Sequence, residues 1–408
     1  MFNAVLFLFF SSLLISQSLM DVFSTILIGF ALFLVAKVRR EGLGGQLDWR
    51  LSSDWIWLPL LLAIALSLGV NAITLDEALP RWIELKWILT FYALLLLLNE
   101  SDLPENFQKW AGGVALLCAL YAIVVWFIGF DPFRGPGSLQ TIPGGVRTGG
   151  FFGQAIIFAH SYAFAFCYAI GFLVMGWRWK SPLRFFYSAL VLLLGLSLLL
   201  SFTRGVWISV SAAVLMMAFV YSRRLGFALV FVGLVCFSGL YFGWSDFQER
   251  LNYTSTGGDS ERAWIWKANW QMFMDSPVFG VGYAENVKQL PKYYQVVGAP
   301  EGLLQSHAHN QYLHFLAGTG VVGLCAYLLV LLYFLNLTRK VWIVIPAKDE
   351  MHKALCLGAL GAQMAFLVGG LTESNYEHSK IKYWLALTFA VVAWLGYKYQ
   401  VIKPKVRP

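Results

Sequence analysis

Long apolar stretches, separated by short polar breaks, dominate the chain. Two examples are WIWLPLLLAIALSLGVNAI at residues 55–73 and WAGGVALLCALYAIVVWFIGF at residues 110–130. Each approaches or reaches the roughly 20 apolar residues that a helix needs to cross a bilayer. The stretches do not alternate between apolar and polar residues over about ten positions, as the strands of a membrane barrel would. The pattern therefore predicts an all-α integral membrane protein.

About twelve stretches are candidate transmembrane helices. They begin near residues 2, 21, 55, 82, 110, 155, 184, 205, 224, 311, 354 and 382. The first stretch lacks the basic segment and cleavage site of a signal peptide, so we expect it to be retained. The pattern predicts nine spans in residues 1–243, with an outer loop at 131–154. A large outer loop at 244–308 and three final spans in residues 309–408 follow.

Composition supports this class of protein. Hydrophobic residues make up 59% of the chain and charged residues 13%, whereas about 25% of the residues of a soluble protein are charged. The five cysteines lie within or beside the apolar stretches and form no CxxC motif. We therefore interpret them as packing residues rather than as disulfides or metal ligands.

The positions of the basic residues predict the orientation of the chain. With a cytoplasmic N-terminus, the basic residues of the inner connections and of the C-terminal tail include Lys37, Arg39, Arg40, Arg50, Arg178, Lys180, Arg184, Arg223, Arg224, Arg339, Lys340, Lys348, Lys353, Lys403, Lys405 and Arg407. This is the expected excess of Lys and Arg inside. One inner connection, NESDLPENFQK, is acidic, but the others outweigh it. We expect both termini to be cytoplasmic. The net charge of +8 reflects the basic residues that set this orientation and does not indicate nucleic-acid binding.

The two outer loops differ in character. The loop at 131–154 is rich in Gly and Pro, so we expect irregular structure. In the larger loop, DSERAWIWKANWQMFMDSP predicts a helix with Asp259 or Ser260 as its N-cap and Pro277 as its stop. Its aromatic face, formed by Trp266, Trp270 and Phe273, is typical of a helix in the lipid headgroup region. A helix that packs on a core would look similar.

Ionisable residues at the ends of spans point to the outer face. They are Glu84, Lys86, His160, Arg204, His307, His309 and Glu373. Singly, such an arginine is usually an interfacial anchor, such a histidine a packing residue and such a lysine a snorkelling one. As a set they favour a functional site, because basic anchors should instead accumulate inside. A coupled transporter would carry charges near the midplane of broken helices, often in repeated halves, and the sequence indicates neither feature.

The stretch SHAHNQYLHF, residues 306–315, contains two histidines spaced two apart. His307 and His309 could supply two metal ligands, with Glu301 or Glu373 as a third. They could also serve as a helix cap and interface anchor, or one could be a general base. Because HExxH and Asp-x-Asp motifs are absent, we favour the general base and expect no metal. We expect His314 to be a packing residue.

Arginines near these histidines indicate a phosphorylated substrate. Arg204, Arg262 and Arg147 carry planar guanidinium groups that suit phosphate oxygens. The helix N-terminus beside Arg262 would add free backbone N–H groups. The sequence therefore predicts a site for a phosphorylated lipid head group at the outer leaflet. The GVG at 280–282 lacks the context of a dinucleotide fingerprint and indicates only a turn.

These motifs resemble those of the bacterial O-antigen ligase family, which is related to the O-antigen polymerases and bacterial O-linked oligosaccharyltransferases. The family pattern is His followed by Asn, Ser or Gln, then nine residues, then Gly-x-x-Gly or a similar motif. It is matched here by His309-Asn310, QYLHFLAGT and Gly320 to Gly323. A second family element is an Arg with an aliphatic residue, usually Leu, four positions later, and here Arg204 precedes Ile208, a mild departure. An arginine in the large loop is matched by Arg262. The motifs cover roughly residues 200–325, and the span layout extends the resemblance weakly to the whole chain.

The resemblance implies a membrane glycosyltransferase of the C type that needs no metal or other cofactor. Its donor would be a polysaccharide linked to undecaprenyl diphosphate, and its acceptor the lipid A core, at the periplasmic face of the bacterial inner membrane. His309 would be the general base in an inverting transfer, and Arg204 and Arg262 would stabilise the leaving diphosphate. Asn310 would orient the loop or the acceptor, and Gly320 and Gly323 would allow close helix approach. The remaining candidate substrate-binding residues are His307, Arg147, Lys86, His160 and Glu373.

Three alternatives stay open at this point. An O-linked protein oligosaccharyltransferase would use the same donor with a Ser or Thr acceptor, and an O-antigen polymerase would join two lipid-linked glycans. The oligosaccharyltransferases usually carry a further C-terminal periplasmic region, whereas this sequence ends at VIKPKVRP, which favours the ligase. A flippase or transporter of lipid-linked glycans would explain the spans and cationic residues without catalysis.

Overall fold

The computed structural model describes residues 2–40, 54–100, 107–142, 145–176, 181–252, 258–303 and 306–402. Within these ranges nine helices are long and apolar enough to cross a membrane, and the protein is an all-α, multi-pass membrane protein. Part of the predicted inner charge lies outside these ranges, namely Arg50, Arg178, Lys180, Lys403, Lys405, Arg407 and residues 101–106 of the acidic connection. The side chain of Arg39 is also outside what the structure describes.

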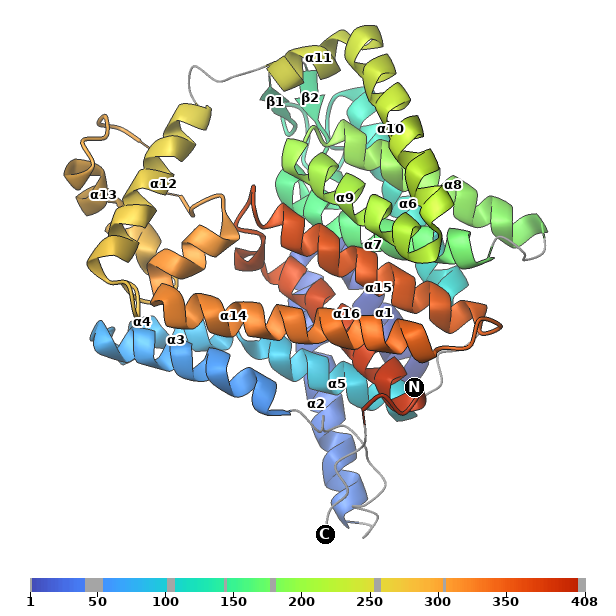
Figure 1. Ribbon diagram of the computed structural model, residues 1–408, viewed down its shortest axis with the longest axis horizontal. Helices are drawn as coiled ribbons and strands as arrows, with labels where there is room; N and C mark the ends of the chain where they lie inside the picture. The colour runs from blue at the N-terminus through green and yellow to red at the C-terminus, as the bar shows by residue number, and fades with distance from the viewer. Residues whose placement is uncertain are drawn as a thin grey trace.

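The helices and strands follow one another along the chain as Figure 1 shows. The first half contains α1 (Phe2–Ile15), α2 (Gln17–Arg40), η1 (Asp54–Trp57), α3 (Leu58–Val70), α4 (Leu75–Ile83), α5 (Lys86–Glu100), α6 (Phe107–Ile128), β1 (Gln140–Ile142), β2 (Gly145–Arg147), η2 (Gly150–Phe152), α7 (Ala155–Met175) and α8 (Ser181–Leu200). The second half contains α9 (Arg204–Tyr221), α10 (Arg223–Gly243), α11 (Ser245–Asn252), α12 (Gly258–Asp275), α13 (Asn286–Val296), α14 (Gln311–Val344), α15 (Glu350–Gly369), η4 (Asn375–Glu377) and α16 (Ser379–Lys398).

A helix lies at each of the twelve positions where the sequence predicts a span. Of these, α1 and the helical stretch formed by η1 and α3 are shorter apolar segments than the nine. The helix α16 is not among the nine either, and it carries Lys380, Lys382 and Lys398. The number of twelve spans therefore stays a prediction.

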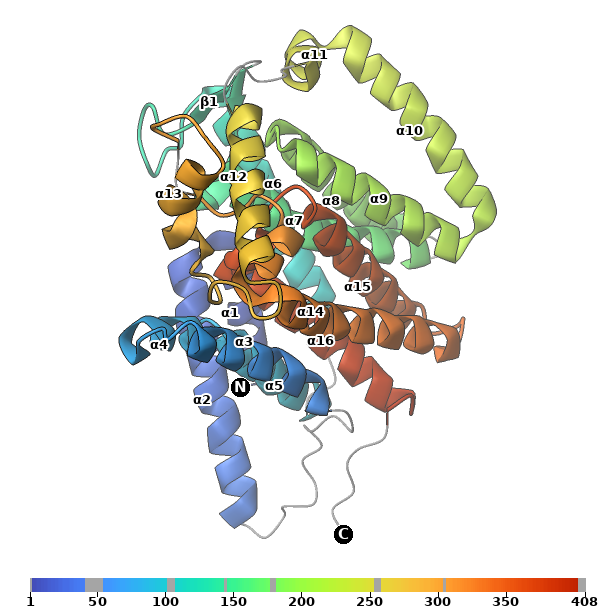
Figure 2. The same cartoon turned by 60° about the vertical axis from the view of Figure 1, so that its left-hand side comes forward.

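The helices α10 and α16 show the two extremes of packing. In α10 the apolar side chains Phe227, Phe231 and Phe242 are exposed, and the helix lies at the outer edge of the molecule, next to α9 (Figure 2). Almost every side chain of α16 is buried instead. Since water would oppose a helix that exposes so much apolar surface, α10 fits a lipid environment. The helix α16 belongs to the centre of the bundle, with α5, α7, α14 and α15 around it.

Small residues bring α7 and α15 close together. A Cβ atom added at Gly171 would lie 2.4 Å from the Ala354 carbonyl oxygen, and one added at Gly358 would lie 2.6 Å from the Tyr168 ring. Close approach through small residues is the usual way in which helices associate in a membrane, because lipid removes the hydrophobic driving force between them.

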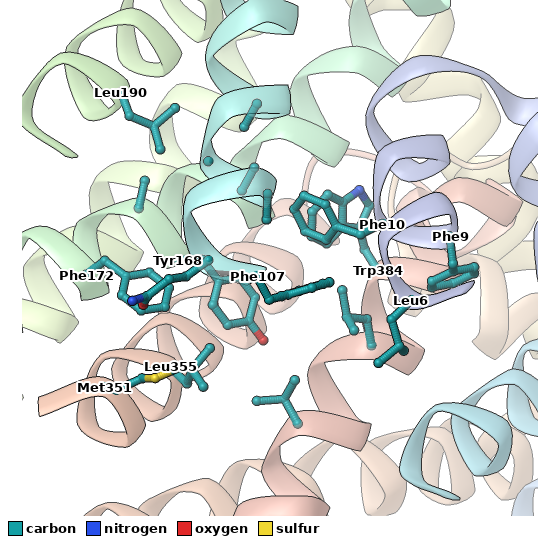
Figure 3. A pocket seen from close by; sticks show the side chains of 18 of the residues that line it. Leu6, Phe9, Phe10, Phe107, Tyr168, Phe172, Leu190, Met351, Leu355 and Trp384 are labelled. Carbon is teal, nitrogen blue, oxygen red and sulfur yellow. The ribbon is translucent and has the colours of Figure 1, made fainter. Parts of the chain in front are cut away.

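An apolar cavity of about 100 Å³ lies between α1, α5, α6, α7, α8, α15 and α16. Figure 3 shows Phe10, Phe107 and Trp384 among the side chains around it. The first helix contributes Leu6, Phe9 and Phe10 to this wall. The first predicted span is thus an integral part of the helical bundle.

The helix α14 is interrupted at Gly320, a break that the sequence analysis does not predict. Gly320 has φ 65° and ψ −168°. The segment 277–282 fills the gap: the N–H groups of Val281 and Gly282 donate to the carbonyls of Ala317 and Gly318, and the Pro277 carbonyl accepts from Val321 N–H. From α3, the Ser67 hydroxyl donates to Gly318 O at 2.8 Å. The polar groups that close this break are therefore uncharged.

Glycines are required at this junction. A Cβ at Gly320 would lie 2.2 Å from the Val278 carbonyl oxygen, and one at Gly280 would lie 2.4 Å from the Gly318 carbonyl carbon. Gly320 thus permits the close approach that the sequence predicts, although the partner is a loop rather than a helix. At Gly323 the nearest atom to an added Cβ is Oγ1 of Thr319, 2.0 Å away in the same helix. Gly323 therefore makes room for Thr319 instead of a neighbouring helix.

The two long connections contain regular structure. Residues 131–154 include an antiparallel hairpin in which Thr141 pairs with Val146, so the prediction of wholly irregular structure is wrong; the β-branched residues here favour a pleated pair. In the larger connection, α12 ends two residues before Pro277, as predicted. It begins at Gly258, one residue ahead of the predicted cap, and the side chains of Asp259 and Ser260 lie outside the described part of the structure.

Ion pairs attach the larger connection to the bundle. Lys288 of α13 lies 3.0 Å from Glu77 of α4 and 2.8 Å from Glu285. Arg81 of α4 approaches Glu285 at 3.2 Å and donates to the Ala284 carbonyl at 3.0 Å. Because Glu285 is buried and bound by two cations, this contact holds α13 against α4.

Candidate active site

Glu373 brings the two histidines of the 306–315 stretch together. His309 donates from Nδ1 to Glu373 Oε1 at 2.9 Å, and Oε2 lies 3.1 Å from the same nitrogen. His307 donates from Nε2 to Oε1 at 3.0 Å. With Nδ1 occupied by the carboxylate, the neutral ring of His309 presents Nε2 as its basic nitrogen. The Ser306 hydroxyl lies 3.4 Å from this nitrogen.

The backbone around His309 fixes the direction of its ring. His309 has φ 48°, in the left-handed region, which costs a residue with a Cβ about 1–3 kcal/mol. Asn310 caps α14 by accepting from Leu313 N–H at 3.0 Å, and it donates to the Leu371 carbonyl at 3.2 Å. Gln311 N–H donates to the Gly370 carbonyl at 2.7 Å. The histidine loop is thus tied to the end of α15, next to Glu373.

Trp266 of α12 holds the same loop from the other side. Its indole N–H donates to the carbonyl of Ala308, the residue between the two histidines, at 2.7 Å. Trp266 and Trp270 are still 41% and 52% exposed, so the aromatic face of α12 is open, as for a headgroup-region helix. The opposite face packs inward through Ile265, Ala268 and Met272. The sequence predicts the exposed face but not the contact with the histidine loop.

One arginine, Arg262, lies beside the cluster, and a second, Arg204, lies on a helix that borders it. Arg262 of α12 places Nη2 3.9 Å from Glu373 Oε2. Arg204 is the first residue of α9, and the next residue, Gly205, packs so closely on Thr372 that an added Cβ would lie 2.1 Å from Thr372 Oγ1. The N-terminus of α9 therefore reaches the residue that precedes Glu373. Backbone N–H groups at such a helix end favour anions.

Arg147 supports the turn in front of Arg204. It is buried, and its guanidinium donates to the Ser201 carbonyl at 2.9 Å and to Thr203 Oγ1 at 2.8 Å. These bonds link strand β2 to the connection between α8 and α9. The geometry fits a positioning role better than direct contact with a substrate.

The other candidate residues lie in different surroundings. His160 is buried in α7, where its Cε1 would lie 3.0 Å from a Cβ at Gly369. Lys86 pairs with Asp21 at 2.9 Å and lines a separate cavity with His378. His314 is buried in a polar network rather than in apolar packing: its Nδ1 lies 2.9 Å from Asn286 Nδ2 and its Nε2 3.3 Å from Glu377 Oε1.

Burial and hydrogen bonding shift the pKa values of the ionisable groups in the cluster. Burial alone would raise the pKa of Glu373, but the hydrogen bonds and positive charge of His307 and His309 hold it well below its ordinary value. Burial would lower the pKa of His307, but the bond to Glu373 raises it overall. Burial, with the charge of His307, lowers the pKa of the neighbouring His378 to about 4. Glu373 is therefore a carboxylate at neutral pH, and His378 is neutral.

The same three groups could hold a metal ion. One ligand atom from each of His307, His309 and Glu373 lies within 4.8 Å of the other two, and two histidines with one carboxylate form a common set for zinc or iron. Glu301, the other carboxylate considered from sequence, is exposed and not part of this group. In the arrangement present, the carboxylate accepts from both imidazoles, which satisfies the three groups without an ion.

His378 and Ser306 are site residues that the sequence analysis does not single out. The ring of His378 packs edge-on against His307, with the centroids 5.7 Å apart. It lies in TESNYEHSK, a polar stretch between the last two apolar segments and on the same side as the histidine pair. This polarity is the signal that could have indicated His378.

The fold and this cluster define a multi-pass helical membrane protein with a histidine and carboxylate site, beside which Arg262 of α12 lies. Residues 188–328 match the family model described as O-antigen ligase, and the resemblance drawn from the sequence is confirmed over this segment. Arg204, Arg262 and His309 lie within it, whereas Glu373 lies beyond it. None of the curated proteins matches the chain.

Proposed function

We propose that the protein is an O-antigen ligase, which transfers a polysaccharide from undecaprenyl diphosphate to a sugar hydroxyl of the lipid A core. The observation that carries this proposal is the His309–Glu373 pair with Arg262 within 3.9 Å of the same carboxylate. A general base next to a phosphate-binding cation is what an inverting transfer from a lipid diphosphate requires. The family match over residues 188–328 supports it.

His309 acts as the general base in this reaction. Nε2 removes the proton of the acceptor hydroxyl, and the oxygen forms a bond to the anomeric carbon of the donor with inversion. Glu373 holds Nδ1 at 2.9 Å, which fixes the tautomer and stabilises the imidazolium that forms. The Ser306 hydroxyl at 3.4 Å from Nε2 marks the position that the acceptor hydroxyl takes. His307 donates a hydrogen bond to the same carboxylate and stabilises its negative charge.

The arginines stabilise the leaving group. As the bond between the anomeric carbon and the diphosphate oxygen breaks, its electron pair leaves with undecaprenyl diphosphate. Arg262 turns from Glu373 towards the phosphate oxygens, and Arg204 with the N-terminus of α9 binds them from the side of Thr372. Asn310 keeps the loop in place, and Arg147 positions the turn before Arg204.

The proposal includes a location. The protein resides in the bacterial inner membrane with both termini in the cytoplasm, and residues 131–154 and 244–308 face the periplasm. The Lys and Arg distribution of the sequence supports this orientation. The described helices fit such a multi-pass protein.

The direct test is transfer by the purified protein. A labelled glycan on undecaprenyl diphosphate is offered with lipid A core, a Ser- and Thr-containing peptide, or a second lipid-linked glycan. Transfer to lipid A core alone is expected. Transfer only to the peptide would identify a protein oligosaccharyltransferase, and transfer only to the lipid-linked glycan a polymerase; either result would contradict the ligase proposal.

Two controls separate catalysis from transport and from metal chemistry. In cells, the His309→Ala variant should lose glycan transfer while the lipid-linked donor still reaches the outer leaflet; loss of the outer-leaflet donor would indicate a flippase. Purified wild-type protein should remain active after exhaustive chelation and dialysis. Loss of activity that returns with one added divalent metal would assign His307, His309 and Glu373 as metal ligands instead.

A further inference from the structure

A polar cavity, separate from the apolar one between the helices, lies next to the histidine cluster. It has a volume of about 350 Å³ and is bordered by α2, the end of α4, α5, α7, η4 and α16. The walls carry charged groups from α2, α5 and α16 in particular: Asp21, Lys86, Lys380 and Lys382. The proposed reaction at His309 leaves this cavity without a role.

Four helices begin at this cavity. Its lining includes Gln17 at the start of α2, Lys86 at the start of α5, Ile157 in the first turn of α7, and Ser379 at the start of α16. Each helix N-terminus carries a partial positive charge and N–H groups without helical partners. Four such ends around one cavity favour a negatively charged group inside it.

The charged side chains of the cavity are paired except at one position. Lys86 lies 2.9 Å from Asp21, and Lys382 lies 2.9 Å from Glu84. Glu377 lies 3.3 Å from Nε2 of His314. Each of the three carboxylates of the lining thus lies next to another partner, and none of them forms an ion pair with the remaining cation of the lining.

Lys380 is the remaining cation of the lining. It is only 4% exposed, yet it lines the cavity. Among the described residues it has no hydrogen bond or ion pair, and its ammonium group rests 3.9 Å from the centroid of the Phe152 ring. A buried ammonium without a carboxylate is costly unless a ligand supplies the negative charge.

His378 connects this cavity with the proposed active site. Its ring lines the cavity and packs against His307, with the two centroids 5.7 Å apart. His307 in turn donates to Glu373 at 3.0 Å. A group bound at Lys380 is therefore separated from the His309 site by only two imidazole rings and a carboxylate.

We propose that the cavity at Lys380 is a binding site for a phosphoryl group, distinct from the site at Arg204 and Arg262. Lys380 and the N-terminal N–H groups of α16 and α5 bind its oxygens. In the enzyme the phosphoryl group belongs to one of the two lipid-anchored substrates, and this assignment to a substrate rests on the proposed function. The binding of phosphate itself does not depend on that function.

The first experiment measures the Lys380 amine directly in the full-length wild-type protein. The protein in detergent is treated with acetic anhydride, with and without inorganic phosphate, and acetylation is quantified by mass spectrometry. Phosphate should protect Lys380 but not Lys292, an exposed lysine that likewise rests on an aromatic ring, that of Tyr293. Equal labelling of Lys380 in both conditions, or no labelling in either, would overturn the proposal.

Variants test the same site by affinity. Phosphate binding should weaken at least about tenfold in Lys380→Met, because a charge-assisted hydrogen bond is lost, and should persist in Lys380→Arg and Lys292→Met. The comparison is made in the Arg204→Met, Arg262→Met, His309→Ala background, so that the proposed phosphate-binding arginines of the active site do not contribute. Unchanged affinity in folded Lys380→Met would refute the site even if the proposed function holds.

Two further arms identify the source of the phosphoryl group. Undecaprenyl diphosphate and phosphorylated lipid A core are each tested for protection of Lys380 in the wild-type protein. Protection by one of them assigns the cavity to the donor or to the acceptor. Protection by inorganic phosphate but by neither lipid would overturn the assignment to a substrate.

Discussion

Two pairs, each of a histidine and a glutamate, come from the same two segments of the sequence: His309 with Glu373, and His314 with Glu377. They differ in how far the histidine is exposed. His309 and Glu373 are joined at 2.9 Å, and the His309 side chain is 18% exposed and has Ser306 near its second nitrogen. His314 and Glu377 approach to 3.3 Å, but the His314 side chain is only 3% exposed and meets Asn286 on its other side. The same chemical groups thus form one open and one closed pair.

The closed pair has a structural consequence. Asn286 also donates to Asn269 of α12 at 2.7 Å, so His314 connects α14 with α12 and α13. Buried polar networks of this kind stabilise one arrangement of a fold when their members are satisfied. A base needs both a partner that orients it and a free nitrogen that a substrate reaches, and only His309 meets both conditions.

The largest contrast is expected from removing the two imidazoles. His309→Ala should lower the rate of glycan transfer by about 10²- to 10⁴-fold, because the general base is lost, with little change in Tm. His314→Ala should lower Tm but leave the rate per folded molecule nearly unchanged. Transfer kinetics and thermal unfolding of the purified variants measure both quantities. Equal loss of rate in the two variants would remove the distinction between the pairs.

Substitution of the two carboxylates should show the same contrast between rate and stability, with smaller effects. Glu373→Gln keeps an acceptor for the histidines but removes the charge that stabilises the imidazolium, so we expect kcat to fall, by less than in His309→Ala. Glu377→Gln should act mainly on Tm. A Glu373→Gln enzyme with wild-type kcat and an unchanged pH profile would show that His309 needs no charged partner.

A glycine substitution should disturb the break in α14 and lower the stability of the fold. Gly320→Ala places a Cβ 2.2 Å from the Val278 carbonyl oxygen at a position with φ 65°, and strain of this kind costs about 1–3 kcal/mol. Thermal unfolding should show the loss of stability. Gly233→Ala in α10 is the control, because an added Cβ there meets nothing within 4 Å and alanine favours a helix. Equal Tm values for the two variants would contradict this account of the break in α14.

The smallest effect concerns pH and His307. Its pKa is raised in the folded protein, mainly through Glu373 against the opposing effect of burial. Its contribution to stability is therefore complete below its unfolded pKa of about 6.5 and is lost as the pH rises through the folded value. The difference in Tm between the wild type and His307→Gln should shrink as the pH rises from about 6 through the raised pKa of His307.

His378 is the matched control for that measurement, with the opposite sign. Burial lowers its folded pKa to about 4, so the wild type loses stability as the pH falls from about 6.5 towards 4, because the unfolded chain binds the proton first. His378→Gln should lack this loss. The same slope for both histidine variants would contradict the opposite environments of the two rings.

The sequence predicts the elements of the protein better than their meeting points. Apolar stretches of the right length locate the helices, and the charge pattern selects His309, Arg262 and Glu373 as residues on one side. It places Glu373 beside His309 only in one alternative, as a third metal ligand, because 64 residues separate them and the packing of α14 on α15 brings them together. Trp266 is read as a lipid-facing aromatic, since its bond to Ala308 depends on the path of a loop.

Other features are outside the reach of local pattern. The break in α14 escapes because its hydrogen bonds come from residues 277–282, and an apolar helix with a glycine looks continuous in sequence. Lys380 looks like one more lysine at the end of a span until its partners are known. The span count, the orientation and the roles of the site residues stay predictions.

The interrupted helix also constrains how the chain enters the membrane. Around Gly320 the backbone groups of α14 find partners in residues 277–282 and Ser67 rather than within the helix. In lipid, each such group without a partner costs several kcal/mol. These residues all precede α14 in the chain, so they are synthesised before it. The partners that close the break are therefore all present in the chain by the time α14 has been synthesised.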